Sequence, residues 1–185
     1  MDLCLVGSEM CIRDSSWNAQ MVLGLLNSFE AFGDKQFLNQ AQRTFTFLRE
    51  NLISGAELMH TFQANKAKIE ANLEDYAFMI RAALGLYQNT GNAYYLEQAD
   101  ELTENAIKKF ETTKNPFFTY TKNPVMFSEI ISVNDNVIPS ANAIMAENLS
   151  TLGHLLEKKE YGAKAKKMLD VMTSYFNEGR GCLLY

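Results

Sequence analysis

Proline, cysteine and histidine are scarce in this chain of 185 residues, which contains three prolines, three cysteines and two histidines. The cysteines, Cys4, Cys11 and Cys182, form an odd and scattered set without CxxC spacing, which argues against a disulfide framework and against a zinc site. The histidines, His60 and His154, lie far apart in the sequence, so neither has a partner at metal-binding spacing. No glycine-rich phosphate loop and no nucleophile elbow occurs in the sequence. The sequence therefore predicts neither a metal nor a cofactor.

Long apolar runs and clustered basic residues are also missing. No apolar run approaches the roughly 18 residues that a membrane-spanning helix needs. Lysine and arginine are interspersed with acids at a net charge of −5, so no basic stripe follows a nucleic-acid backbone. Because 47% of the residues are apolar and 21% are charged, the composition is that of a globular protein. We predict a cytoplasmic protein with neither a membrane nor a nucleic-acid partner.

The first fifteen residues differ in kind from the rest of the chain. Residues 1–15 show neither a helical nor a strand period, and they lack the basic start and apolar centre of a signal peptide. The run from Val6 to Asp14 (VGSEMCIRD) matches one reading frame of a transposase adapter used in preparing sequencing libraries. We predict that residues 1–15 are not native sequence and pack irregularly, with a native tail as the alternative. Because GRGCLLY ends the chain without a helix-ending signal, residues 16–185 are predicted to be a fragment.

Six segments with helical periodicity follow, and they come in three pairs. Gly33 and Gly91 lie in the turns of the first two pairs, where glycine supplies the positive φ at which a helix stops. An aromatic residue four positions before alanine recurs at Phe37, Tyr95 and Tyr161, at a spacing longer than tetratricopeptide or HEAT repeats. The predicted helices span residues 16–32, 37–52, 74–89, 94–110, 140–156 and 161–176.

The two helices of each pair differ in polarity. The first, third and fifth helices are apolar nearly all round, which predicts burial on every side. The second, fourth and sixth are amphipathic and are expected to face water. This alternation describes an inner ring wrapped by an outer ring, so the predicted fold is all-α: a partial (α/α)6 toroid of three helix hairpins, without a sheet of four or more strands. Long linkers at about 53–73 and 111–139 both precede inner helices, which places the expected pocket at that rim.

Each inner helix opens with polar or aromatic residues that its apolar body does not require. Such groups from three helices would offer hydrogen-bonding partners and aromatic faces to a sugar-like ring. Glu74 and Asp75 are the predicted catalytic residues, and one of them would act alone, because adjacent residues on a helix point in different directions. The predicted substrate-binding residues are Trp17, Asn18, Tyr76, Asp135, Asn136, Ser140 and Asn142.

These candidates also have purely structural interpretations. Ser140 has the residue type and position of a helix N-cap. Glu74 and Asp75 suit the first turn of a helix because they complement its dipole. Trp17 is equally suited to a core. As a set drawn from three helices, the candidates favour a binding site more than a catalytic one.

Two further features lie outside that set. His60, in the first long linker, is an additional candidate for a general acid or base, whereas His154 lies near the connector end of the fifth helix. Residues 117–120, FFTY, alternate in the second long linker and predict a short strand that packs on the rim.

Three runs carry a family resemblance: SWNAQM (16–21), NLEDYAFMIRAALGLYQNTGNAYYLEQA (72–99) and NDNVIPSANAIMAENLSTLG (134–153). They resemble the helical portion of the thioredoxin domain-containing proteins related to the spermatogenesis-associated family, and EDYAF and DNVIPSAN are the most specific parts. The resemblance covers residues 16–176. It implies a longer protein in which a thioredoxin-like domain with a CxxC-type motif precedes a six-hairpin toroid similar to sugar epimerases and glycosidases. This chain would contain the later half of that toroid.

Two functional classes remain open. In the first, the intact protein is a carbohydrate-active isomerase or hydrolase whose rim residues hold the sugar. In the second, the toroid is a non-catalytic binding or scaffold domain that serves the redox domain. The expected partners are a carbohydrate or another polar small molecule, and the N-terminal portion of the same protein.

Overall fold

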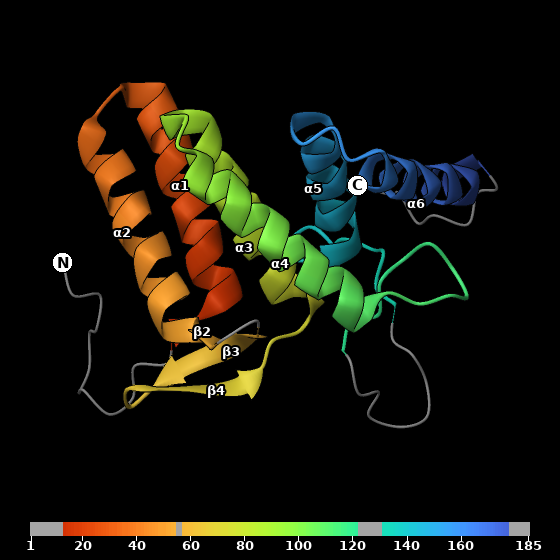
Figure 1. Ribbon diagram of the computed structural model, residues 1–185, viewed down its shortest axis with the longest axis horizontal. Helices are drawn as coiled ribbons and strands as arrows, with labels where there is room; N and C mark the ends of the chain where they lie inside the picture. The colour runs from red at the N-terminus through yellow and green to blue at the C-terminus, as the bar shows by residue number, and fades with distance from the viewer. Residues whose placement is uncertain (1–12, 55–56, 122–130, 178–185) are drawn as a thin grey trace.

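Six helices arranged as three hairpins make up most of the chain (Figure 1). The computed structural model describes residues 13–54, 57–121 and 131–177. All six predicted helices are confirmed, and their ends lie within two residues of the predicted ones. The helices are α1 (Ser15–Phe32), α2 (Lys35–Leu52), α3 (Leu73–Thr90), α4 (Ala93–Phe110), α5 (Ala141–Leu155) and α6 (Lys159–Asn177). Within the described ranges, no helix is long and apolar enough to cross a membrane.

The turns of the first two hairpins share one mechanism. Gly33 has φ 70° and Gly91 has φ 66°, and the N–H group of each donates to the carbonyl of the residue four positions earlier. Asp34 and Asn92 then cap the next helix with their side chains. The third turn lacks this glycine and instead places Glu157 at φ 56°. The sequence therefore predicts the two glycine turns directly, whereas it gives no such signal for the third turn.

The inner helices pack side by side, and each is covered by one outer helix. Helix α3 lies between α1 and α5, and both Met79 and Ile80 on it are fully buried. On the outer helices, Ala41 and Ala99 of the repeated aromatic–alanine pattern are fully buried. Helix α1 has another helix on only part of its surface, and Met21 on it is 53% exposed. The predicted alternation of inner and outer helices is confirmed, with the most complete burial in the central hairpin.

A small antiparallel sheet, which the sequence did not predict, lies at one end of the helices (Figure 1). Its four strands are β1 (Arg13–Asp14), β2 (Ile53–Ser54), β3 (Glu57–Gln63) and β4 (Lys66–Glu70). The strands β1, β2 and β4 all pair with β3. The prediction that the fold lacks a four-stranded sheet was therefore wrong, and the first long linker is a hairpin instead of an irregular loop.

The turn of this hairpin explains why the sequence signal was weak. Ala64 and Asn65 join β3 to β4 with φ values of 50° and 56°, which is the backbone of a tight two-residue hairpin turn. Such turns usually carry Asn-Gly or Asp-Gly, and alanine in the first position hides the pattern. Strand β3 is also only partly covered, with Leu58 and Thr61 as its buried residues, so it shows no clean alternation of apolar and polar residues.

Residues 13–15 belong to this end of the structure. Arg13 pairs with Phe62 and Asp14 pairs with Thr61 in the sheet, while Ser15 is fully buried at the start of α1. The prediction of irregular packing was therefore wrong for these three residues. The run from Val6 to Ile12 and all three cysteines lie outside the described residues.

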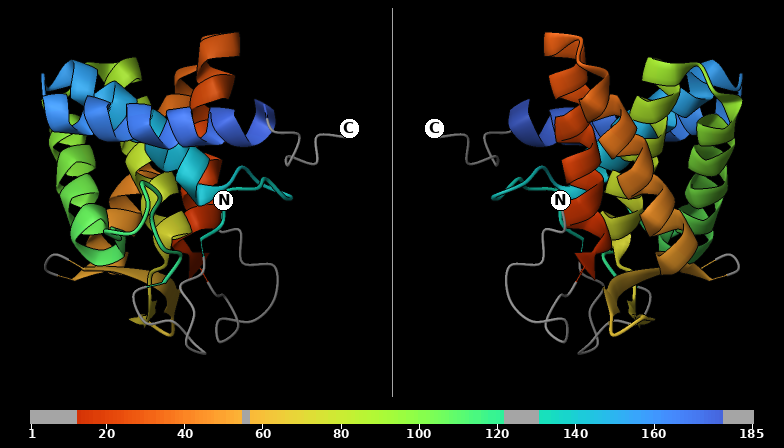
Figure 2. Two further views of the ribbon diagram at one scale, coloured as in Figure 1. Left: turned by 90° about the vertical axis from the view of Figure 1, so that its right-hand side faces the viewer. Right: turned by 90° about the vertical axis from the view of Figure 1, so that its left-hand side faces the viewer.

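Both long linkers lie at the same end of the helical array, as the sequence predicted (Figure 2). In the second linker, Phe118 forms a single antiparallel bridge with Glu111. This bridge stands in place of the short strand predicted at residues 117–120. The Tyr120 carbonyl accepts a hydrogen bond from the Leu73 N–H group at 3.0 Å. The second linker is thereby tied to the start of α3.

Candidate functional site

A pocket of about 330 Å³ opens at the rim where the inner helices begin. Helix α1 contributes Trp17, helix α3 contributes Glu74, and the second long linker supplies most of the remaining wall. Its lining residues are Trp17, Glu74, Tyr120, Ser132, Asn134, Asn136, Val137, Ile138, Pro139, Ser140 and Ala141. The pocket thus combines two aromatic side chains, one carboxyl group and several neutral polar groups.

Glu74 is the ionisable centre of the pocket. Burial raises the pKa of the Glu74 carboxyl above its ordinary value. The nearby Ser16 hydroxyl partly offsets this effect, and the negative charge of Asp75 adds to it. Burial also raises the pKa of the Tyr120 phenol, again with a contribution from Glu74. A partly buried carboxyl that holds its proton more tightly than usual is suited to proton transfer.

Trp17 gives the pocket an exposed aromatic surface. The side chain is 58% exposed although it lies in the first turn of an inner helix. Two residues before it, Ser15 is fully buried, and Ser16 is 1% exposed. The two buried neighbours fix the backbone on which the exposed indole is held. Because the indole is exposed, Trp17 does not belong to the core, which excludes its structural interpretation.

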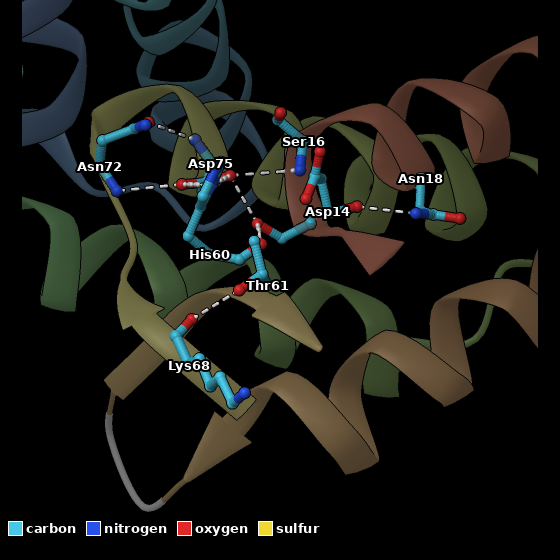
Figure 3. Close-up of polar contacts among 9 residues, drawn as sticks. Asp14, Ser16, Asn18, His60, Thr61, Lys68, Asn72 and Asp75 are labelled. Atoms are coloured by element: carbon cyan, nitrogen blue, oxygen red, sulfur yellow. Dashed lines mark hydrogen bonds and ion pairs between the residues drawn. The ribbon is translucent and has the colours of Figure 1, made fainter. Parts of the chain in front are cut away.

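Asp75 lies next to Glu74 in sequence but points into the protein (Figure 3). It has no exposed surface. Its Oδ1 atom accepts from the Ser15 hydroxyl at 2.5 Å and from the Ser16 N–H group at 3.2 Å. Its Oδ2 atom accepts from the Asn72 N–H group at 3.0 Å, and His60 Nδ1 lies 2.9 Å from both oxygens. No ligand in the rim pocket can reach this carboxylate, so direct contact with a substrate is not available to Asp75.

Asn142 and Tyr76 are also buried in structural positions. Asn142 is 1% exposed; its amide oxygen accepts from Phe118 N–H at 2.8 Å, and its amide nitrogen donates to the carbonyls of Phe118 and Ser132. Tyr76 has no exposed surface, and its hydroxyl accepts from the Leu58 N–H group at 3.1 Å. Neither side chain lines the pocket, so the expectation that both converge on it was wrong.

The remaining candidates shape the rim. Asn18 donates to the Asp14 carbonyl at 2.7 Å, and Asp135 accepts from the Ser140 N–H group at 2.8 Å. The Ser140 side chain accepts from the Ala143 N–H group at 3.2 Å, as an N-cap does. Asn136 and Ser140 both line the pocket, and Asn136 is exposed. Ser140 therefore caps α5 and borders the pocket at the same time.

No family model matches the chain. It is 29% identical over 161 residues to the uncharacterized protein B0495.5 of Caenorhabditis elegans, covering 83% of this chain and 22% of that protein. It is 25% identical over 172 residues to spermatogenesis-associated protein 20 of Homo sapiens, covering 86% of this chain and 22% of that protein. The chain is homologous to the latter protein, and it spans about a fifth of the length of these relatives.

Solved structures show the fold. The chain superposes on cellobiose 2-epimerase from Spirochaeta thermophila with a TM-score of 0.72 and 13% identity, covering 90% of this chain and 44% of the epimerase. It superposes on a GH76 α-mannanase from Bacteroides thetaiotaomicron with a TM-score of 0.70 and 12% identity, covering 89% of this chain and 45% of the mannanase. The chain has half of a six-hairpin toroid.

Within the half toroid, the sequence missed two features of the site. Tyr120 was considered only as part of a packing strand, yet it lines the pocket beside Glu74. His60 was considered alone as an acid or base, and its pairing with Asp75 was not foreseen. The signal for both lies in the long linkers, whose positions relative to the inner helices follow from tertiary structure and from no local pattern.

Proposed function

We propose that this chain forms half of a carbohydrate-binding toroid in a longer protein, and that its rim pocket binds a sugar with Glu74 as the proton carrier. The observation that carries the proposal is that Trp17 and Glu74, a partly buried carboxyl of raised pKa, line the same pocket of about 330 Å³. That volume lies within the range of small-molecule sites, roughly 300–1,000 Å³. Aromatic faces with a few convergent polar groups suit a sugar ring, which has apolar faces and a polar edge.

The role of Glu74 follows from its environment. A carboxyl with a raised pKa keeps its proton at a pH at which an ordinary glutamate has lost it, so it can donate that proton to a hydroxyl or glycosidic oxygen. The resulting carboxylate can later accept a proton from the bound molecule. Proton transfer of this kind serves either an isomerase or a hydrolase. The names of the structural neighbours include both an epimerase and a mannanase, which supports a sugar as the ligand class.

A second candidate function is a non-catalytic binding or scaffold domain attached to a thioredoxin-like redox domain. It is favoured by the burial of Asp75, because Glu74 is then the one carboxyl group that lines the described pocket. Hydrolysis and isomerisation generally need two proton-carrying groups. For the enzymatic proposal, the second group comes either from elsewhere on this rim or from the rest of the longer protein.

Sugar binding by the chain tests the proposal. Isothermal titration calorimetry with D-mannose and with cellobiose compares the wild-type chain with Glu74→Gln and Trp17→Ala. Each variant is expected to weaken binding by about tenfold, because each loses one polar or aromatic contact of about 1.4 kcal/mol. Glu50→Gln is the matched control, since Glu50 is an exposed glutamate on α2 that does not line this pocket, and it is expected to bind like the wild type.

The outcomes separate the functional classes. If neither sugar binds, or if both pocket variants bind like the wild type, the carbohydrate pocket is rejected. Binding that depends on Trp17 and Glu74, with turnover of the sugar by the longer protein that is lost in Glu74→Gln, supports the enzyme. The same binding without any turnover supports the scaffold domain.

A further inference from the structure

Three elements meet at the buried Asp75 carboxylate, and the proposed chemistry of the pocket uses neither this group nor His60. The carboxylate receives hydrogen bonds from Ser15 and Ser16 at the start of α1, from Asn72 at the start of α3 and from His60 on β3 (Figure 3). Its burial is complete, whereas the His60 side chain is 29% exposed. The Asp75 carboxylate thus forms hydrogen bonds with the first turns of two inner helices and with one strand.

The same contacts exclude a serine-hydrolase triad. In such a triad the histidine takes the proton of the serine hydroxyl while the carboxylate holds the other side of the ring. Here the Ser15 hydroxyl donates directly to Asp75 at 2.5 Å, and its second contact is with the backbone carbonyl of His60 at 3.3 Å. The hydroxyl therefore has no imidazole to activate it, and the cluster holds elements together.

The two pocket residues to which the proposed function gives a role are each adjacent in sequence to a residue of this hydrogen-bonded cluster. Trp17 follows Ser16, and Glu74 precedes Asp75. Any shift of the first turn of α1 relative to the first turn of α3 therefore changes the separation of the indole from the Glu74 carboxyl. We infer that Asp75 and His60 are positioning residues of the pocket: the hydrogen bonds from Ser15 and Ser16 to Asp75 hold these two turns together, His60 supplies the counter-charge of that buried carboxylate, and the arrangement sets the distance between Trp17 and Glu74. This inference rests on the proposed function for its consequence in ligand binding.

The charged groups around His60 make the stabilisation by the His60–Asp75 ion pair dependent on pH. Asp75 and Glu74 face it from α3, and Asp14 faces it from β1. On β4, the residues opposite its neighbours in β3 are Lys68 and Glu70. These acids outnumber the single lysine, so the surroundings favour the imidazolium form.

The sign of the effect follows from the His60–Asp75 contact. The hydrogen bond to Asp75 raises the pKa of His60, against the lowering effect of burial. Because the pKa is higher in the folded chain than in the unfolded one, the stabilisation from the charged pair is fully present below the ordinary histidine pKa and is lost as the pH rises through the raised value. Above that pH, Asp75 keeps its neutral donors but loses its counter-ion, and the first turn of α1 is held less firmly.

The chain contains one tryptophan and two histidines, which allows a test without any ligand. Trp17 fluorescence is followed from pH 5 to pH 9 in the wild type, His60→Gln, His154→Gln and Glu74→Gln, with far-UV circular dichroism to confirm folding. The wild type is expected to show one emission transition above the ordinary histidine pKa. His60→Gln is expected to lose the whole transition, whereas His154→Gln and Glu74→Gln retain it.

The inference is overturned if the wild type shows no transition, if His60→Gln retains it, or if Glu74→Gln abolishes it. Asp75→Asn is the second variant, and it is expected to remove the transition if it folds. Should Asp75→Asn fail to fold, His60→Gln alone decides the outcome, because the glutamine keeps a side-chain donor and removes the positive charge that titrates.

A binding arm separates this inference from the proposed function. With D-mannose and cellobiose as probes at pH 6, His60→Gln is expected to weaken binding by about tenfold, because a displaced binding group loses most of its contribution. The His154→Gln control is expected to bind like the wild type. If the fluorescence transition is present but no sugar binds, the positioning pair stands and the proposed function fails. If sugar binds through Trp17 and Glu74 with no transition and unchanged affinity in His60→Gln, the positioning role fails alone.

Discussion

Asn142→Ala discriminates most directly between a ligand-binding residue and a structural one. Asn142 is a substrate-binding candidate by its residue type and position, whereas in the structure its amide lies between two segments of the second long linker. It contacts both backbone polar groups of Phe118 and the carbonyl of Ser132, at distances of 2.8, 3.1 and 2.9 Å. The variant therefore removes three hydrogen bonds at once, two of them buried, and should destabilise the fold more than it affects binding.

The magnitude follows from these contacts. A hydrogen bond within a protein contributes about 1 kcal/mol net, and a buried donor left without a partner costs about 1–3 kcal/mol. Phe118 has no exposed surface, so water cannot replace the lost bond to its N–H group without opening the linker. We expect Asn142→Ala to lower the free energy of unfolding by about 3 kcal/mol. Asn142→Asp should cost at least as much, because its carboxylate would face two carbonyl oxygens that now accept from the amide.

Urea denaturation followed by circular dichroism measures this difference, with the slope of the transition reported beside the midpoint. Asn136→Ala is the control, since Asn136 is exposed in the same linker, and it should change the stability by less than about 0.5 kcal/mol. A loss below about 1 kcal/mol for Asn142→Ala, or an Asn142→Asp variant as stable as the wild type, would refute the structural role.

Two further predictions concern the third hairpin. A Cβ atom on Gly153 would lie 2.8 Å from the Gly162 backbone nitrogen, so Gly153→Ala should destabilise the chain by about 1–3 kcal/mol. A Cβ atom on Gly162 would enter open space, so Gly162→Ala should stabilise the chain by roughly 0.5–1 kcal/mol. Thermal unfolding compares the two variants. Lys158 donates to both oxygens of Asp100 at 2.7 Å, so Lys158→Met should cost about 2 kcal/mol in urea denaturation, and the exposed Lys159→Met should cost less than about 0.5 kcal/mol.

The helices could be predicted because their signals are local. Gly33 and Gly91 mark two turns through their backbone conformation, and the apolar faces of the helices follow a period that a short window captures. The order of inner and outer helices follows from the same pattern, since α3 has apolar residues nearly all round and is buried over most of its surface. Contacts between residues distant in sequence are not needed to predict these features.

The sheet and the second linker could not be predicted for the opposite reason. Strand β3 is held by partners from three places in the chain, and its own residues alternate only weakly between buried and exposed. Tyr120 reaches the start of α3 through a backbone hydrogen bond to Leu73, which no side-chain pattern encodes. The end of the array at which the linkers lie could therefore be predicted, whereas the contacts that the linkers make could not.

The pair Glu74–Asp75 shows how far residue type can specify a role. Both are acids in the first turn of α3, and their different directions around the helix predict that one would act alone. The structure assigns the directions: Asp75 occupies the capping position that bonds back to Asn72, so its carboxylate faces the neighbouring chain segments, while Glu74 faces the pocket. Because the cap fixes the rotation of this turn, the residue that completes the cap also decides where its neighbour points. A variant that breaks the cap should therefore impair Glu74 even though it leaves that carboxyl unchanged.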